Sequence, residues 1–265
     1  MNKRKGIILA GGLGTRFSPI TLGISKHLIP IFDKPMIYYS LSTLMMADIR
    51  EILLISTERD LSIFKNLLGD GSSWGLEIEY LIQENPKGIA QAFLLAENFL
   101  QGSPSALILG DNFFFGDGLQ TKLLKVSKIE KGATIFGYQV KDPERYGIAK
   151  YDKKGNVIKL IEKPKEYISD IAITGIYFYD KNVCEYARQL KPSKRGEFEI
   201  TDLNNIYLEM NQLYLERMGR GYAWLDAGTP DSLLEASQFV QTIEHRQGLK
   251  ICCPEELAFK KGWIS

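Results

Sequence analysis

The sequence contains few of the residues on which several enzyme classes depend. Its 265 residues include two histidines, His27 and His245, and three cysteines, none of which forms a CxxC pair. Adjacent cysteines are poor partners for each other and for a zinc site. We therefore expect reduced, packed side chains at Cys184, Cys252 and Cys253. Because histidines are so few, we also expect a reaction that does not depend on histidine acid–base chemistry.

The chain also lacks a long apolar run and an excess of charge. No segment approaches the ~20 apolar residues of a membrane span, and the apolar stretch near the N-terminus is too brief for a signal peptide. The formal net charge is +1, which gives no electrostatic reason to expect nucleic acid or a membrane surface as a partner. We therefore expect a cytoplasmic protein whose important positive charges are local.

The pattern of apolar residues predicts an α/β fold. In the first half, short apolar runs alternate with helical segments, which favours a mostly parallel sheet with helices on both faces. The predicted strands cover residues 6–10, 51–56, 77–83 and 106–110, and the predicted helices cover 36–47, 61–68 and 88–100. Ligands of such sheets bind at the carboxyl ends of the strands.

The second half predicts a mixed sheet and later helices. Strands at 146–152 and 157–163 flank a Lys-Lys-Gly-Asn turn typical of a hairpin. Further strands are predicted at 133–140, 171–179 and 214–218, and helices at 199–210 and 231–246. Thr229 precedes the last of these helices and can cap it. Since no repeat or linker marks a boundary, we expect a single domain.

A glycine-rich turn follows the first predicted strand. In the stretch KGIILAGGLGTRFSPIT, Gly11, Gly12 and Gly14 allow backbone amides to approach a ligand closely, and phosphate is the usual one. A dinucleotide fingerprint would need a third glycine where the chain has Phe17. A P-loop would need Lys followed by Ser or Thr directly after its last glycine, where this chain has Thr15. Both familiar phosphate loops are therefore excluded.

Two cations accompany this turn. Arg16 lies on its shoulder and Lys26 follows ten residues later. An arginine fork and a lysine point charge beside a glycine-rich turn suit a triphosphate, whose charges need cations as well as amides. The alternative is a solvated turn without a ligand.

Carboxylates appear where two further strands end. Asp111 follows LILG, and Asp226 follows the apolar run 222–225. Mg²⁺ prefers oxygen ligands and often bridges to substrate phosphates, so the two carboxylates together suit this ion. Each alone is equally compatible with a helix cap or a turn. In LIEKP, Lys163 can bind a phosphate monoester and Glu162 can accept from sugar hydroxyls, although such a pair is also common at an exposed hairpin edge.

Taken together, these motifs resemble the sugar nucleotidyltransferases, and most closely the glucose-1-phosphate thymidylyltransferases. The resemblance is carried by the stretches already quoted and by SKHLIPIFDKPMIYYSLSTLM, ALILGDNFFFGDGL, DPERYGIAKYD, RGEFEITDLNNIYLE and GRGYAWLDAGTPDSLLEAS. It implies a Rossmann-like mixed sheet flanked by helices, of the nucleotidyltransferase or GT-A-like type, with a small sugar-binding hairpin and C-terminal helices. It also implies one domain over 1–265, with a nucleotide-binding part at about 1–112, a sugar-phosphate part at about 113–228 and a helical segment at 229–265.

The resemblance also implies roles for individual positions. Asp111 and Asp226 would bind Mg²⁺, and together with Arg16, Lys26 and Lys163 they would form the catalytic set. The implied nucleotide-binding residues are Gly11, Gly12, Gly14, Thr15, Arg16, Lys26, His27, Gln83, Gly88 and Asp111, of which Gln83 and Gly88 would read the base. The implied sugar-phosphate residues are Asn112, Tyr146, Gly147, Glu162, Lys163, Ile173, Thr201 and Trp224.

The implied reaction explains the shortage of histidine. A thymidylyl group passes from dTTP to α-D-glucose 1-phosphate, which yields dTDP-glucose and pyrophosphate and opens dTDP-L-rhamnose or related deoxysugar synthesis. Because a phosphate monoester has a second pKa near ~6, its attacking oxygen is already charged at neutral pH and needs no general base. The resemblance further implies a homotetramer with a feedback site between subunits, for which residues 116–119 and 249–256 are the candidates.

The sequence leaves some alternatives open. His27 stands where this family usually has glutamine, so it either donates to phosphate or ribose or lines the pocket wall, and UTP remains a rival to dTTP. A uridylyl- or cytidylyltransferase acting on another sugar 1-phosphate is the alternative enzyme. A non-catalytic nucleotide-sugar sensor would be expected to have lost cations and carboxylates that this chain retains.

Overall fold

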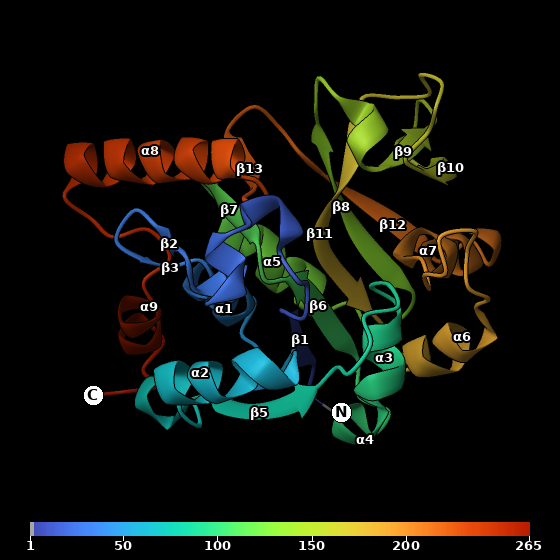
Figure 1. The fold of residues 1–265 in the computed structure, drawn as a ribbon. Helices are drawn as coiled ribbons and strands as arrows, with labels where there is room; N and C mark the ends of the chain where they lie inside the picture. The colour runs from blue at the N-terminus through green and yellow to red at the C-terminus, as the bar shows by residue number, and fades with distance from the viewer. Residues whose placement is uncertain (1–2) are drawn as a thin grey trace.

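A nine-stranded sheet forms the centre of the computed structural model, which describes residues 3–265. Its strands are β1 (Lys5–Leu9), β4 (Glu51–Ser56), β5 (Glu77–Ile82), β6 (Ser105–Leu109), β8 (Ala133–Gln139), β9 (Gly147–Tyr151), β10 (Val157–Glu162), β11 (Ile171–Tyr179) and β12 (Leu213–Met218). The order is β10-β9-β11-β6-β1-β4-β5, with β8 paired to β11 and β12 (Figure 1). β1 is parallel to β4 and β6, whereas β11 is antiparallel to β6. The predicted mixed α/β sheet is therefore confirmed.

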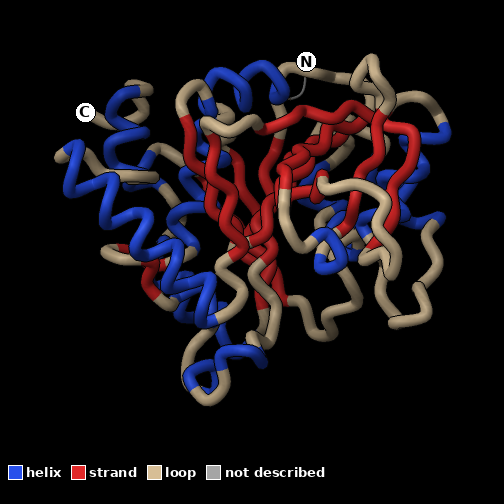
Figure 2. Tube along the Cα trace, turned by 90° about the horizontal axis from the view of Figure 1, so that it is seen from above, coloured by secondary structure: helices blue, strands red, loops and turns tan. Residues whose placement is uncertain are grey.

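Helices cover both faces of this sheet, because the strands are apolar on both sides. Ile8 and Ile52 pack with α1 (Ile37–Met46), α2 (Glu58–Leu68), α5 (Leu119–Ser127) and α9 (Pro254–Lys260). Ile7 and Leu53, which alternate with them, pack with α3 (Gln91–Leu95), α4 (Glu97–Leu100), α6 (Val183–Gln189) and α7 (Ile200–Glu209). Figure 2 shows the strands enclosed between these helices. Among residues 3–265, none of the helices is long and apolar enough to cross a membrane.

Several elements differ from the sequence prediction, and α5 and α6 were not predicted at all. The predicted helix over 88–100 begins only at Gln91 and is divided at Ala96. Gly88 cannot belong to it, because its φ is +94° and a Cβ there would lie 2.5 Å from the Phe198 carbonyl oxygen. The pattern also did not predict β7 (Asn112–Gly116), which directly follows the turn at Asp111.

A smaller layer lies beside the main sheet. In it, β7 pairs with β13 (Tyr222–Asp226), and the short strands β2 (Pro30–Ile31) and β3 (Lys34–Pro35) form a hairpin. The long helix α8 (Pro230–Gln247) closes this layer. Ile31, Tyr39, Phe113 and Val240 are all fully buried in the core between them. α8 therefore covers both the hairpin and the β7–β13 ribbon.

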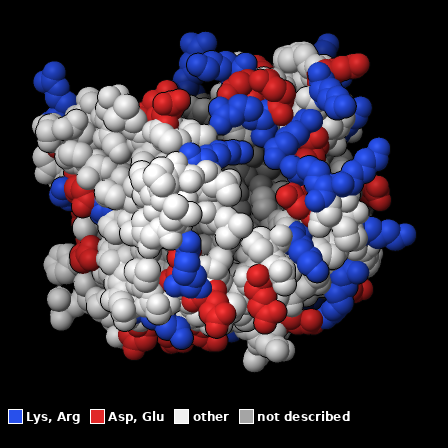
Figure 3. Space-filling view, viewed as in Figure 1, with Lys and Arg blue, Asp and Glu red and all other residues white. Residues whose placement is uncertain are grey.

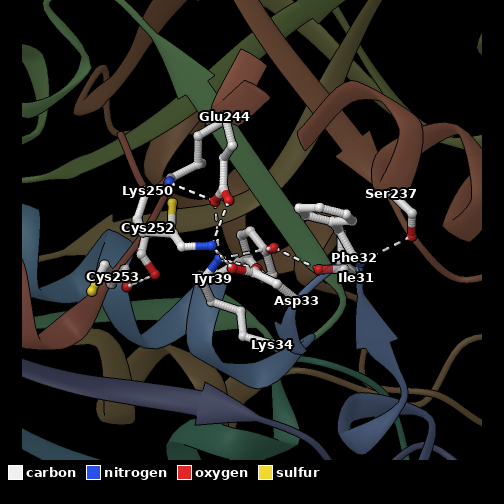
Figure 4. A network of polar contacts seen from close by, with 12 residues as sticks. Ile31, Phe32, Asp33, Lys34, Tyr39, Ser237, Glu244, Lys250, Cys252 and Cys253 are labelled. Atoms are coloured by element: carbon white, nitrogen blue, oxygen red, sulfur yellow. Dashed lines mark hydrogen bonds and ion pairs between the residues drawn. The ribbon is translucent and has the colours of Figure 1, made fainter. Parts of the chain in front are cut away.

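A network of charged side chains fastens the β2–β3 hairpin to the end of α8 (Figure 4). Lys34 lies 2.6 Å from Asp33 and 3.4 Å from Glu244, and Lys250 bridges the same two carboxylates at 2.5 and 2.9 Å. Glu244 is only 6% exposed and also accepts from the Ile251 amide. Since a buried charge without a partner is strongly destabilising, the four groups hold the hairpin in place together.

The start of α8 carries a capping box. Thr229 Oγ1 accepts from the Ser232 amide at 3.2 Å, and Ser232 Oγ accepts from the Thr229 amide at 3.1 Å. The predicted cap is therefore confirmed. It fixes the start of α8 only a few residues after Asp226, so the helix and the end of β13 are positioned together.

We expect Thr229→Ala to lower the free energy of unfolding by about 1 kcal/mol, because an alanine cannot accept from the Ser232 amide. Urea unfolding followed by circular dichroism measures this loss. Thr242→Ala is the matched control, because Thr242 lies on the exposed side of the same helix and bonds only back to Gln238. Its effect should stay within about 0.5 kcal/mol. Equal losses in the two variants would contradict the capping role.

Candidate active site

A cavity of about 390 Å³ opens at the carboxyl ends of β1 and β6. Figure 3 shows the molecule hollowed beside a group of Lys and Arg side chains around β9 and β10. The predicted residues that line the cavity are Gly12, Arg16, Gln83, Gly88, Asp111, Asn112, Tyr146, Gly147, Glu162, Lys163, Ile173, Thr201, Trp224 and Asp226. We call Gly12, Arg16, Gln83 and Gly88 the N-terminal wall, and Tyr146, Gly147, Glu162, Lys163 and Thr201 the hairpin wall.

The glycine-rich turn packs directly against the side chain of Gln83. A Cβ at Gly11 would lie 2.4 Å from Gln83 Oε1, so glycine allows the Gln83 side chain to keep this position. Gly14 has a φ of +62° and precedes the short 3₁₀ turn Thr15–Phe17, which carries Arg16. The Lys26 side chain passes close to Gly12. The turn therefore brings Arg16, Lys26 and Gln83 around one space.

The orientation of Gln83 is set by its neighbours. This side chain is 3% exposed, and its Nε2 donates to Gln91 Oε1 at 2.9 Å. Gln91 Oε1 in turn accepts from the Lys87 amide at 2.8 Å. The Gln83 carbonyl oxygen is thereby directed toward the glycine-rich turn, while the Gly88 backbone lies at the same edge of the cavity.

The two predicted carboxylates lie side by side, although they come from opposite halves of the chain. Asp226 ends β13 opposite Asn112, and the Ala227 amide donates to the Asp111 carbonyl at 3.0 Å. A Cβ at Gly228 would lie 2.9 Å from Asp226 Oδ1 and 3.5 Å from Asp111 Oδ2. Lys26 Nζ is 2.5 Å from Asp111 Oδ2. The β7–β13 ribbon thus directs both carboxylates into one small space.

The electrostatics of this pair favour an added cation. Burial, together with the neighbouring Asp111 carboxylate, raises the pKa of Asp226 above its usual range. Burial acts in the same direction on Asp111, but Lys26 and the other neighbouring groups, the Asn112 amide among them, together outweigh it and hold the pKa of Asp111 low. Lys26 is bonded to Asp111 and not to Asp226, so a metal ion bound between the two carboxylates would stabilise their negative charge.

The donor set fits a divalent ion that arrives with a phosphate ligand. Within residues 3–265, no cluster of three or more His, Cys, Asp or Glu side chains is placed to hold a metal. Two carboxylates are nevertheless sufficient for Mg²⁺, which is usually bound by one or two carboxylates while waters and substrate phosphates complete its coordination. Asp111 and Asp226 can therefore hold such an ion when a polyphosphate is present.

Asn112 ties three strands together behind these carboxylates. Its Oδ1 accepts from the Gly175 amide of β11 at 3.0 Å and from Trp224 Nε1 of β13 at 2.6 Å. Its Nδ2 donates to Asp111 Oδ1 at 3.0 Å. Gly175 must be glycine, because a Cβ there would lie 2.5 Å from Asn112 Oδ1. Asn112 thus holds the Asp111 carboxylate in position at the cavity.

The hairpin wall combines a carboxylate with a strained lysine. Glu162 Oε2 accepts from Thr201 Oγ1 at 2.6 Å, and both lie close to Gly147. Lys163 has a φ of +42°, and its amide donates to the Tyr146 carbonyl at 3.0 Å. Left-handed backbone at a residue other than glycine is strained and persists where the surrounding structure enforces it, commonly at functional sites.

The sequence reasoning missed several residues that also line the cavity: Pro86, Arg145, Tyr177, Arg195 and Glu199. Arg195 makes a two-pronged ion pair with Glu199 at 2.8 and 3.2 Å and lies 3.5 Å from Glu162. The stretch RGEFEITDLNNIYLE carried part of the resemblance, but Arg195 and Glu199 were given no role, because charged residues in a loop are also typical of a solvated surface. The signal that could have identified Arg195 and Glu199 is their closeness in the sequence to Thr201, a predicted site residue.

His27 lies behind the cavity, not on its surface. The ring is 2% exposed, and its Nδ1 is 3.1 Å from Ser25 Oγ. A Cβ at Gly110 would lie 2.7 Å from its Cδ2. Burial, followed by the charge of Lys26, lowers the pKa of His27 to about 3, so the ring is neutral. The ring therefore lies beneath the residues that line the cavity.

We expect Asn112→Ala to lower the free energy of unfolding by about 2 kcal/mol or more, because it leaves the buried Gly175 and Trp224 N–H groups without an acceptor. Trp224→Phe is the matched comparison, since it removes one donor but leaves Asn112 paired with Gly175. Its loss in urea unfolding should be about half as large. A larger loss in Trp224→Phe than in Asn112→Ala would contradict the central position of Asn112.

Known proteins resemble this chain over nearly its whole length. The family model described as nucleotidyl transferase matches residues 5–243. A glucose-1-phosphate thymidylyltransferase of Xanthomonas campestris pv. campestris (strain B100) is 57% identical over 264 residues, which cover 100% of this chain and 90% of the relative. The enzyme of that name from Mycobacterium tuberculosis (strain H37Rv) is 53% identical over 260 residues, covering 98% and 90%.

Solved structures give the same result. A Bacillus anthracis protein assigned to that enzyme class and solved in complex with sucrose has a TM-score of 0.82 and 41% identity, covering 89% of this chain and 94% of its own. A UDP-glucose pyrophosphorylase in complex with UDP-glucose shares the fold, with a TM-score of 0.79 at 23% identity and coverage of 91% and 99%. On the match over residues 5–243 and these identities, the chain belongs to the nucleotidyl transferase family.

Proposed function

We propose that this protein transfers a thymidylyl group from dTTP to α-D-glucose 1-phosphate, producing dTDP-glucose and pyrophosphate. The observation that carries the proposal is the pair of adjacent carboxylates, Asp111 and Asp226, between two cationic walls of one cavity. Relatives more than half identical to the chain over nearly its whole length are named for this activity.

The N-terminal wall suits the nucleotide. The amide of Gln83 and the backbone of Gly88 can bond to the edge of a pyrimidine, because Gln91 fixes the orientation of Gln83. The glycine-rich turn offers backbone amides to the phosphates, and Arg16 adds a planar fork of donors. Lys26 is held by Asp111 at the point where the triphosphate would meet the carboxylates. We assign this role to about residues 1–112.

The hairpin wall suits the sugar phosphate. Glu162 keeps one carboxylate oxygen bonded to Thr201, and its other oxygen can accept from sugar hydroxyls. The Lys163 ammonium lies 3.9 Å from Glu162 and is 47% exposed, so it can pair with the phosphate of the same substrate. Tyr146, Ile173 and Trp224 complete this side of the cavity. We assign this role to about residues 113–228.

The reaction needs orientation and charge compensation more than proton transfer. The phosphate oxygen of glucose 1-phosphate attacks the α-phosphorus of dTTP in line, and pyrophosphate leaves with the bonding electrons. That oxygen is already ionised at neutral pH, so the site needs no general base. Arg16 and Lys163 hold the two reactants from opposite walls, which turns the encounter into a unimolecular step. Mg²⁺, when held by Asp111 and Asp226, supplies further positive charge to the phosphate oxygens.

A substrate panel tests this proposal. We expect pyrophosphate release to be fastest with dTTP and glucose 1-phosphate, compared with UTP, CTP and other sugar 1-phosphates. Excess EDTA should abolish the release and added Mg²⁺ should restore it, because the two carboxylates repel the phosphates unless a cation lies between them. A clear preference for UTP would overturn the nucleotide assignment, and full turnover in EDTA would overturn the metal assignment.

We expect Arg16→Ala to lower kcat on the order of 10²-fold without loss of fold, because it removes a preorganised donor to the phosphates. Steady-state pyrophosphate release measures kcat, and circular dichroism checks the fold. Arg220→Ala is the control, since Arg220 is exposed and does not line the cavity. Near-normal turnover of a folded Arg16→Ala variant would count against this assignment.

A further inference from the structure

Arg145 is a cation at the cavity that the proposed function does not use. It ends the short 3₁₀ turn Pro143–Arg145, which follows β8 and leads into β9. Its side chain is 45% exposed and lines the cavity together with Tyr146 and Asp226. Arg16 reaches the same cavity from the turn after β1. Arg16 and Arg145 therefore enter the cavity from different parts of the fold, and of these two only Arg16 has a proposed role so far.

The guanidinium of Arg145 is held in position with donors to spare. Its Nη1 donates to Asp142 Oδ2 at 2.7 Å, which is the one hydrogen bond that its side chain makes within residues 3–265. Its Cζ lies 5.4 Å from the centre of the Tyr146 ring, and that ring is 5.2 Å from the Trp224 ring. An arginine fork offers several N–H groups, so one carboxylate does not saturate it. Asp142 and Tyr146 thus orient a guanidinium that can still bind an anion.

Arg145 shares its cavity with the carboxylate pair. Asp111, Asp226 and Arg16 line the same cavity as its side chain. Tyr146, over which the guanidinium lies, also lines this cavity and packs against Trp224. Arg145 is therefore at the cavity in which the two phosphate substrates would meet.

Lys26 and Arg195 are more fully neutralised than Arg145. Lys26 is bonded to Asp111 at 2.5 Å. Arg195 faces three carboxylates, at 2.8 Å from Glu199, 3.3 Å from Glu197 and 3.5 Å from Glu162. Arg145 has the single partner Asp142, which is itself partly exposed and solvated. Opposite the N-terminal wall, Arg145 is thus the arginine whose charge is least compensated.

We propose that Arg145 is a further catalytic residue, whose guanidinium donates to the phosphoryl oxygens of the reacting α-phosphate from the side opposite Arg16. This inference rests on the proposed function. As the sugar-phosphate oxygen bonds to the α-phosphorus, the bond from that phosphorus to the bridging oxygen breaks, and pyrophosphate leaves with the electron pair. No proton is transferred. Negative charge spreads over the α-phosphate oxygens in this step, and a guanidinium placed there stabilises it.

The test compares Arg145→Ala with Arg217→Ala. Arg217 is the matched control because its Cζ also lies over a tyrosine ring, 4.5 Å from the centre of the Tyr151 ring, but it does not line the cavity. We expect kcat to fall on the order of 10²-fold in Arg145→Ala and to stay within about twofold of wild type in Arg217→Ala. Arg145→Lys should recover only part of the loss, because lysine keeps the charge but not the planar fork.

Binding measurements separate a catalytic role from a structural one. By titration calorimetry, Arg145→Ala should bind dTTP and glucose 1-phosphate, each alone, within about fivefold of wild type, since the proposed contact is strongest in the transition state. A kcat within about threefold of wild type, or a loss confined to KM, would overturn the inference. Failure of the wild-type protein to form any nucleotide sugar would instead overturn the proposed function.

Discussion

Two carboxylates held side by side in a buried place repel each other, and the candidate site is organised around this repulsion. Asp111 and Asp226 share one small space at the end of the β7–β13 ribbon. Lys26 compensates one of them, and burial raises the pKa of the other. An arrangement of this kind is costly for a fold that binds nothing. It is favourable in a protein whose ligands bring a cation and several phosphates to the same point.

The sequence predicted the frame of the molecule well because its signals were local. The continuous apolar run that contains Ile7 and Ile8 predicted a buried strand, and Thr229 predicted the start of α8. It failed where tertiary contacts decide the structure. The late start of the helix after Gly88 depends on the Phe198 backbone, which is distant in sequence. β7 forms only because β13 pairs with it.

The residues of the candidate site divide in the same way, into those with a local sequence signal and those that only tertiary contacts reveal. Residues on strand ends and glycine turns, such as Asp111 and Gly11, were recognisable because the backbone requirement and the chemistry coincide. Arg145 and Arg195 were not, because an arginine in a charged loop is common and only the fold shows that it faces a cavity. His27 was ambiguous for the opposite reason. Its place in the wall depends on packing against Gly110 and Ser25, which no local pattern reports.

The β7–β13 ribbon has a consequence for the way the molecule is made. Its two strands come from opposite halves of the chain, so the ribbon closes a long loop and forms late relative to the local βα units. During synthesis, the sheet around β1 can therefore begin to pack while Asp226 is still in the ribosome. A nascent or truncated chain that stops before β13 would carry every element of the N-terminal wall but would lack Asp226, the second carboxylate of the proposed metal site. The two carboxylates of the proposed metal site therefore come together only when β13 pairs with β7.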